Sequence, residues 1–170
     1  MISDKLRDAL NKQVNEELQS YYIYLGIAAY FEDKNLNGFA HWMHLQAEEE
    51  RNHAMRIYNF LYDRGARVNL LPLDAPPADW DSPLAAFEES LAHERMISGL
   101  IHHLVDLAVE ENDHPTQTFL QWFVNEQVEE EATADDIIQQ LKLVGDAPTG
   151  IFLLDRELAQ RQPEAGREAE

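Results

Sequence analysis

The sequence contains no cysteine. Its absence excludes disulfide bonds, iron–sulfur clusters, cysteine-ligated zinc and thiol-based catalysis. Basic residues are also scarce, because 13 Lys and Arg stand against 32 Asp and Glu, which gives a formal net charge of −19. Since phosphate binding needs basic surfaces, this balance argues against nucleic acid as the main partner and favours cations, basic partners or simple solubility.

Long apolar runs are missing as well. The uncharged stretch from Leu18 to Phe31 has 14 residues, fewer than the roughly 20 that a helix needs to cross a bilayer. The first residues, Met1 to Lys5, show no basic region followed by an apolar run, so a signal peptide is not expected. The sequence thus predicts a soluble, cytoplasmic protein with no membrane partner.

Proline and glycine are sparse, at seven each in 170 residues, and they occur in clusters. Between the clusters, apolar residues recur at alternating steps of four and three, which is the core stripe of a packed helix. Each uninterrupted segment has about 30 residues and would form a helix on the order of 45 Å long. The four segments are 4–33, 37–64, 83–112 and 115–144.

The connections between these segments predict their arrangement. Short gaps at 33–37 and 112–115 make each flanking pair an antiparallel hairpin. The 18-residue stretch 65–82 is long enough to run the length of a bundle. The predicted fold class is therefore all-α, a four-helix bundle with one long crossover between the second and third helices.

The chain is predicted to form one domain. The bundle occupies residues 1–145, and a linker with a short fifth helix, Thr149 to about Arg161, follows within 146–161. Residues 162–170 are predicted to be a solvated tail.

Polar residues interrupt the apolar stripes at mid-length, and a common offset relates them. Each polar position in the first hairpin has a counterpart 77 residues later in the second hairpin. The two hairpins therefore place polar groups at matching heights, as a pseudo-twofold arrangement would, and all six side chains are predicted to meet near the middle of the bundle. The pairs are Glu17 with Glu94, Glu50 with Gln127, and His53 with Glu130.

This set of side chains indicates a pair of metal ions. Burying an unpaired charge costs several kcal/mol, and two divalent cations supply the four positive charges that four carboxylates require. Oxygen ligands with one imidazole suit iron or manganese better than copper or structural zinc. Di-iron carboxylate bundles use a Glu from each of two helices and Glu-x-x-His from each of the other two. Here Glu50-x-x-His53 matches, whereas Gln127-x-x-Glu130 replaces the second motif, so the two metal positions should be unequal.

A simpler interpretation is available for each residue alone. Single glutamates are usually exposed, so any one of them fits a surface group at the edge of its stripe. The shared level and offset of the whole set argue against that interpretation.

A second acidic group lies beside the first. Glu49 and Glu126 share the 77-residue offset, and Glu129 follows three residues later. These residues sit one position around their helices from the stripe, so they are predicted to be half exposed. The spacing is compatible with a looser third iron site or an exit route, and equally with a solvated acidic face.

Two aromatic residues lie near the predicted centre. Tyr24 follows Glu17 by two helical turns on the same face, where it would hydrogen-bond a site carboxylate, donate an electron, or simply be a core tyrosine. Trp122 either borders the site or contributes packing. The other histidines form no comparable cluster and are interpreted as surface or partly packed groups: His41, His44, His93, His102, His103 and His114.

With these residues in place, the sequence resembles a non-haem prokaryotic ferritin over nearly its whole length. Together the motifs that carry the resemblance are highly specific. They are Glu17, Glu49-Glu50-x-x-His53, Trp80-Asp81-Ser82-Pro83 leading into the third helix, Glu94, and Glu126-Gln127-x-Glu129-Glu130.

The resemblance implies a ferritin-like bundle and a ligand assignment. The first iron position would be bound by Glu17, Glu50 and His53. The second would use Glu50 as a bridge, together with Glu94 and Glu130.

The resemblance also implies further members of the site. Gln127 would lie near the second iron position. A third position would be bound by Glu49, Glu126 and Glu129, with Glu130 shared.

Comparison with sister families favours the non-haem ferritins over the bacterioferritins. Tyr24 matches the tyrosine beside the centre in non-haem ferritins. Bacterioferritins carry a second Glu-x-x-His and a haem-ligating methionine directly after the glutamate of the second helix. Because that position is Arg51 here, haem is not expected.

The function that the resemblance implies is iron storage with ferroxidase activity. Fe(II) would bind the paired site, O2 or H2O2 would accept the electrons, and ferric mineral would collect inside a hollow homo-oligomer of 24 subunits. Two alternatives come from other classes of protein. One is a di-iron oxidase or peroxidase that acts on a small substrate without storage, and the other is a metal-free helical scaffold with a protonated centre.

Overall fold

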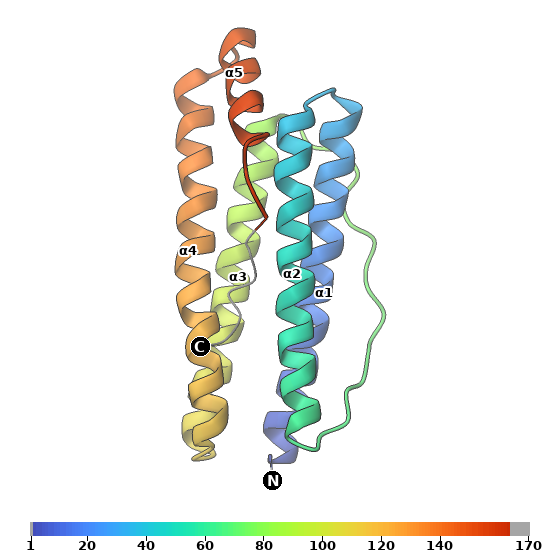
Figure 1. Ribbon diagram of the computed structural model, residues 1–170, viewed down its shortest axis with the longest axis vertical. Coiled ribbons are helices and arrows are strands. Elements are labelled where there is room, and N and C mark those ends of the chain that lie inside the picture. The colour runs from blue at the N-terminus through green and yellow to red at the C-terminus, as the bar shows by residue number, and fades with distance from the viewer. Residues whose placement is uncertain (1, 164–170) are drawn as a thin grey trace.

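The computed structural model describes residues 2–163 and contains four long helices and one short helix (Figure 1). No strand occurs within this range. The predicted all-α class is confirmed, and the four long segments agree with their predicted bounds to within two residues. The helices are α1 (Asp4–Asp33), α2 (Asn37–Asp63), α3 (Pro83–Glu110), α4 (His114–Val144) and α5 (Pro148–Leu158).

Two antiparallel hairpins, α1 with α2 and α3 with α4, make up the bundle (Figure 1). Each hairpin turn contains an asparagine in the left-handed region, Asn35 with φ 58° and Asn112 with φ 54°. Asparagine tolerates this conformation better than other non-glycine residues. The Asp113 side chain then accepts a hydrogen bond from Thr116 N (3.0 Å) and caps α4.

The crossover from α2 to α3 runs the length of the bundle beside α1 (Figure 1). Two side-chain amides of α1 hold its backbone. Asn11 donates to Arg67 O (3.1 Å) and accepts from Asn69 N (2.7 Å), and Gln19 makes the same pair of bonds with Asp74 (3.0 and 2.7 Å). Further along, Gly26 lets the crossover approach closely, because a Cβ there would lie 2.9 Å from the Pro76 ring.

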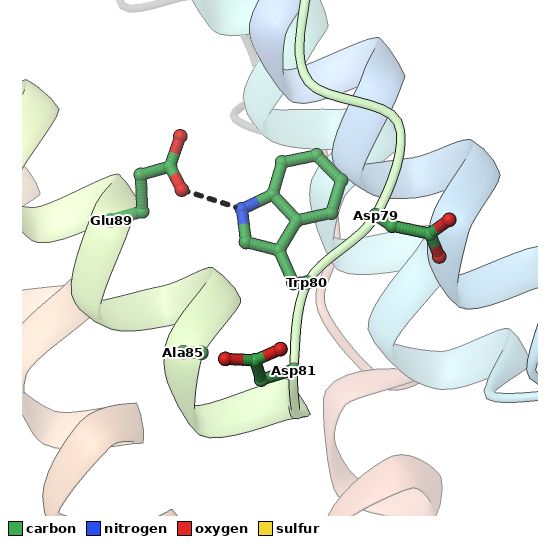
Figure 2. Close-up of a pocket in the computed structure, with 5 residues that line it drawn as sticks. All are labelled: Asp79, Trp80, Asp81, Ala85 and Glu89. Atoms are coloured by element: carbon green, nitrogen blue, oxygen red, sulfur yellow. Dashed lines mark hydrogen bonds between the residues drawn. The ribbon is translucent and has the colours of Figure 1, made fainter.

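The crossover ends at the start of α3. Figure 2 shows Trp80 Nε1 donating to a carboxylate oxygen of Glu89, at 2.7 Å. The indole also packs edge-on against Tyr30, with ring centroids 5.3 Å apart. Ser82 then caps α3 by accepting a hydrogen bond from Ala85 N (3.1 Å). The Trp80-Asp81-Ser82-Pro83 motif therefore fixes where the second hairpin begins.

The buried apolar residues form two clusters, one toward each end of the bundle. One cluster includes the rings of Phe31, Phe39 and Phe87, and the other includes Leu10 and Ile57. Along each long helix, the predicted metal ligands fall between the segments that contribute to the two clusters, whereas Tyr24 belongs to the first cluster. The polar centre is thus enclosed above and below by apolar packing.

Helix α5 packs against α2 at the end of the bundle where α2 begins (Figure 1). The N-cap of α2, Leu36, has no side-chain hydrogen bond of its own. Instead, Asp155 Oδ1 accepts from Gly38 N (2.8 Å) and Phe39 N (3.1 Å), so a carboxylate of α5 caps α2. A Cβ at Gly38 would lie 1.6 Å from the Asp155 carbonyl oxygen, so only glycine permits this contact.

The fifth helix is shorter than predicted. It ends at Leu158 rather than near Arg161, and residues 159–163 leave it and return alongside α2 (Figure 1). Residues 164–170, most of the predicted tail, lie outside the described residues. Within the described range, no helix is both long and apolar enough to cross a membrane.

Candidate metal centre

The first predicted ligand group lies between α1 and α2. Glu17, Glu50 and His53 are all buried, and each offers a ligand atom within 4.8 Å of the others. His53 Nδ1 lies 3.3 Å from Glu50 Oε2 and 4.0 Å from Glu17 Oε2. Because Glu50 and His53 are one helical turn apart, both project from the same face of α2 toward α1.

The second group lies against the first and draws on three helices. Glu50, Glu94 and Glu130 also bring ligand atoms within 4.8 Å of one another. Tyr24 is buried, and its hydroxyl donates to Glu94 Oε1. Gln127 Nε2 donates to Glu94 Oε2 (3.1 Å). Glu50 belongs to both groups, which is the position a bridging carboxylate needs.

Two glutamines donate hydrogen bonds to the carboxylates of the centre. Each glutamine lies about one helical turn before a ligand glutamate of its own helix. Gln13 Nε2 donates to Glu17 Oε1 (2.9 Å). Gln46 Nε2 donates to Glu50 Oε1 (3.2 Å) and to Glu130 Oε2 (2.6 Å). These neutral donors orient the carboxylates but bring no positive charge to the centre.

Burial sets the electrostatics of the centre. It raises the pKa of Glu17 to about 8, with a further contribution from the nearby Glu50. Burial and then the charge of Glu94 raise the pKa of Glu50 well above its usual range, and burial and then Glu50 do the same for Glu130. In the metal-free protein these carboxyl groups are held toward their protonated forms.

The donor set fits iron. It provides hard carboxylate oxygens and one imidazole, as iron and manganese prefer. Glu17 Oε2 is buried and has no hydrogen-bond partner within residues 2–163. An oxygen in that position is well suited to a cation, which would also replace the protons that burial retains.

The second acidic group only partly matches its prediction. Glu49 is half-buried as predicted, but Glu126 is buried at 5% exposure and Glu129 is exposed, so for these two the prediction is wrong. At 3.6 residues per turn, Glu126 lies only about 40° around α4 from Glu130, whereas Glu129 lies about 100° away. Glu126 therefore joins the centre, where its ligand atom lies within 4.8 Å of those of His53 and Glu130.

Of the two interpretations of Trp122, the structure supports the one in which it borders the centre. Its ring meets the His53 ring edge-on, with centroids 5.3 Å apart, and the Arg56 guanidinium lies 4.2 Å from the Trp122 ring centroid. Of the other histidines, His93 contacts a residue beside the centre, since its ring centroid lies 6.3 Å from that of Tyr24, and its Nε2 is 2.7 Å from Ser20 Oγ. Burial lowers the pKa of His93.

Comparison with known protein families identifies the chain. The Ferritin family, described as a ferritin-like domain, matches residues 7–144, which cover the whole bundle apart from the first turn of α1. The chain is a member of the ferritin family. The motif resemblance to ferritins is thereby confirmed.

Individual relatives agree with this assignment. A bacterial non-heme ferritin from Bacteroides fragilis is 45% identical over 161 residues, which cover 95% of this ferritin and 100% of that protein. One from Staphylococcus saprophyticus is 38% identical over 161 residues, covering 95% and 96%. The non-haem branch predicted from the sequence is confirmed.

Solved structures support the fold. The open pore ferritin from the hyperthermophilic archaeon Archaeoglobus fulgidus is 48% identical, with a TM-score of 0.94 and coverage of 95% of this chain and 100% of that one. A closed form of the A. fulgidus ferritin, engineered by site-directed mutagenesis, gives the same TM-score and identity. The predicted bundle with its long crossover is therefore a ferritin bundle.

Some residues around this ferritin's centre are not among those predicted from the sequence. Gln13 and Gln46 each precede a ligand glutamate by four residues, a spacing that marks neighbours on one helix face and is sufficient to identify them. Arg161, which forms a 2.6 Å salt bridge with Glu49, carries no such signal, because it lies beyond the last helix.

Proposed function

We propose that this ferritin oxidises Fe(II) at the paired carboxylate centre and stores the Fe(III) product as mineral inside a hollow shell. The observation that carries the proposal is the pair of buried ligand groups that share Glu50 at the middle of the bundle. The family membership and the non-heme ferritin relatives support storage rather than a separate small-molecule oxidase.

Each ligand has a distinct role in this proposal. Glu17 and His53 hold one Fe(II), Glu94 and Glu130 hold the other, and Glu50 bridges the two. Each iron gives one electron. Dioxygen takes both electrons with two protons and leaves as hydrogen peroxide, or hydrogen peroxide takes them with two protons and leaves as two waters.

The surrounding residues keep the two positions unequal. Gln127-x-x-Glu130 carries one carboxylate, as a second Glu-x-x-His would, but it provides no imidazole, so His53 of the first position has no counterpart at the second. Gln127 instead donates to Glu94. Tyr24 donates to the other oxygen of Glu94 and orients this carboxylate. Hard oxygen donors favour the higher charge of Fe(III), so the ligand set assists oxidation.

A third iron position belongs to the same proposal. Glu126 lies beside Glu130 in the interior, Glu49 is half-buried, and Glu129 faces outward. This sequence of decreasing burial gives Fe(III) a path of carboxylates from the centre to the surface.

The shell is proposed to contain 24 copies and to reside in the cytoplasm. At 19.6 kDa per chain, such a particle has a mass of about 470 kDa. The net charge of −19 per chain would attract Fe(II) toward pores and a mineral surface.

Stopped-flow measurement of Fe(II) oxidation in air tests the residue assignment. The combined substitution Glu50→Ala and Glu94→Ala removes the bridge and one ligand of the second position. Because loss of even a supporting group commonly costs 10- to 100-fold, the fast phase should fall at least about 100-fold.

The matched control is Glu48→Ala with Glu88→Ala, which removes two exposed glutamates from the same two helices. This protein should oxidise iron at the unchanged rate, and circular dichroism should show both variants folded. An unchanged fast phase in the Glu50/Glu94 variant would refute the assignment.

A further inference from the structure

The chain beyond α5 returns toward the centre. In Figure 1 it descends from the end of α5 alongside α2. The contacts of Arg161 hold this segment against α2. His41 Nε2 donates to the Arg161 carbonyl oxygen (3.0 Å), and the Arg161 guanidinium lies 4.2 Å from the centroid of the Trp42 ring. Arg161 Nη1 also donates to Trp42 O (3.2 Å).

The guanidinium makes its strongest contact with a residue of the proposed third position. Arg161 Nη2 lies 2.6 Å from Glu49 Oε2, and the two side chains are only 18% and 12% exposed. A charge-assisted bond in such a sheltered place is stronger than a surface ion pair. The stacking on Trp42 limits the freedom of the guanidinium and so favours the bonded geometry.

The same guanidinium reaches the paired centre through one intermediate residue. Arg161 Nη1 donates to Gln46 Oε1 (3.0 Å), which leaves Gln46 Nε2 directed at Glu50 and Glu130. Arg161 thereby fixes which way the Gln46 amide points. A continuous set of hydrogen bonds connects the segment after α5 with the bridging carboxylate.

We propose that Arg161 takes the place of a cation beside Glu49, so that a metal ion binds the third position in competition with the guanidinium. This inference rests on the proposed function, in which Glu49 is a ligand of that position. A guanidinium and a divalent ion on one carboxylate repel each other, and the guanidinium already uses Glu49 Oε2. Arg161 is therefore a positioning residue that keeps the third position weak while the pair fills first.

Linkage adds a reciprocal consequence. If Arg161 weakens metal binding at Glu49, a metal ion there weakens the bond between Arg161 and Glu49 by the same factor. Filling of the third position would thus loosen the segment 159–163 from α2. Whether a metal ion occupies the third position would therefore determine how firmly residues 159–163 are held against α2.

Calorimetric titration of the metal-free protein with Zn(II), a redox-inert probe, tests the proposal without any oxidation step. Wild type should show two tight ions per chain and a weaker third. Arg161→Gln should tighten the third step about tenfold, within the usual range of coupling between sites. Arg156→Gln makes the same change of charge at an exposed position of α5, so it should leave the third step unchanged.

A double-mutant cycle with Glu49→Gln decides whether the effect acts through that carboxylate. In the Glu49→Gln background, Arg161→Gln should no longer alter the third step. A third step that is equal in wild type and Arg161→Gln, or is absent from Arg161→Gln, would overturn this inference and leave the paired centre intact. Failure of wild type to bind the first two ions would instead contradict the proposed function.

Discussion

Glu17 occupies a position at which a helix bundle ordinarily carries an apolar residue. It is 1% exposed, and so are Glu50 and Glu94. Burial keeps the Glu17 carboxyl protonated up to a pH of about 8, so the metal-free protein tolerates it as a neutral acid. The same residue becomes a ligand when a cation replaces the proton. One side chain is thus accommodated in both the metal-free and the metal-bound protein.

The raised pKa of Glu17 predicts how the metal-free protein responds to pH. An ordinary glutamate, as in the unfolded chain, loses its proton near 4.5, whereas folded Glu17 keeps it to about 8. The folded state therefore binds more protons between these values, and stability falls as pH rises, by up to about 1.4 kcal/mol per pH unit for this group. Thermal unfolding in chelator should show a lower Tm at pH 8 than at pH 5.

Two comparisons isolate the cause. Glu17→Gln should weaken the dependence, because a neutral amide has no proton to lose, while Glu50 and Glu130 keep their raised pKa values. Zn(II) should restore the Tm at pH 8 in wild type, since the ion supplies the missing counter-charge. A Tm that stays constant or rises from pH 5 to pH 8 without metal would show that these carboxyls do not titrate as described.

The centre is largely predictable from the sequence, because the helical period determines the face of its helix on which each residue lies. The offset of 77 residues and the helical period together suffice to bring Glu17, Glu50, His53, Glu94 and Glu130 to one level. The exposure of Glu126 is harder to predict, because an angular difference of about 40° on one helix decides between interior and surface. Arg161 is not predictable in this way, because no periodicity constrains a segment outside a helix.

At the scale of elements, α5 is fixed to the bundle by a cap that two helices share. Asp155 of α5 accepts from the first free N–H groups of α2, and Gly38 allows the close backbone approach. This contact also determines where residues 159–163 start, and therefore where Arg161 meets α2. The close approach that Gly38 permits thus contributes to placing Arg161 beside Glu49.

Substitution of Gly38 should separate α5 from the bundle. In Gly38→Ala the new Cβ would lie 1.6 Å from the Asp155 carbonyl oxygen, so α5 must move. Overpacking of this kind costs about 1–3 kcal/mol, and hydrogen exchange of residues 148–158 should become faster than in wild type.

The matched control is Gly99→Ala. A Cβ at Gly99, in the middle of α3, meets nothing within 4 Å. Alanine there should stabilise the helix by about 0.5–1 kcal/mol because it loses less backbone entropy on folding. Equal Tm values for the two alanine variants would show that the contact between Gly38 and Asp155 does not hold α5.

The bounds of the elements are predictable where the sequence carries caps. Ser82, Asp113 and Gly145 mark helix ends by side-chain capping or by positive φ, and the long helices begin or end there. The end of α5 lies three residues before its predicted place, because no glycine or proline stands between Leu158 and Gln162 to indicate a stop.

At the scale of the whole molecule, the bundle is one wall of a proposed shell. The structural relatives from A. fulgidus include an open pore form and an engineered closed form. One relative with this fold therefore exists in an open pore form and, after mutagenesis, in a closed form. The shell arrangement depends on contacts between copies, and helical periodicity within one chain does not encode these contacts.

Iron loading in air tests the central claim most directly. The protein is given Fe(II) in repeated additions, separated by size-exclusion chromatography, and assayed for iron in each fraction. We predict that iron elutes with a particle of about 470 kDa at far more than the three ions per chain that the carboxylate sites can hold. Iron that saturates at two or three per chain, or elutes apart from the protein, would contradict storage.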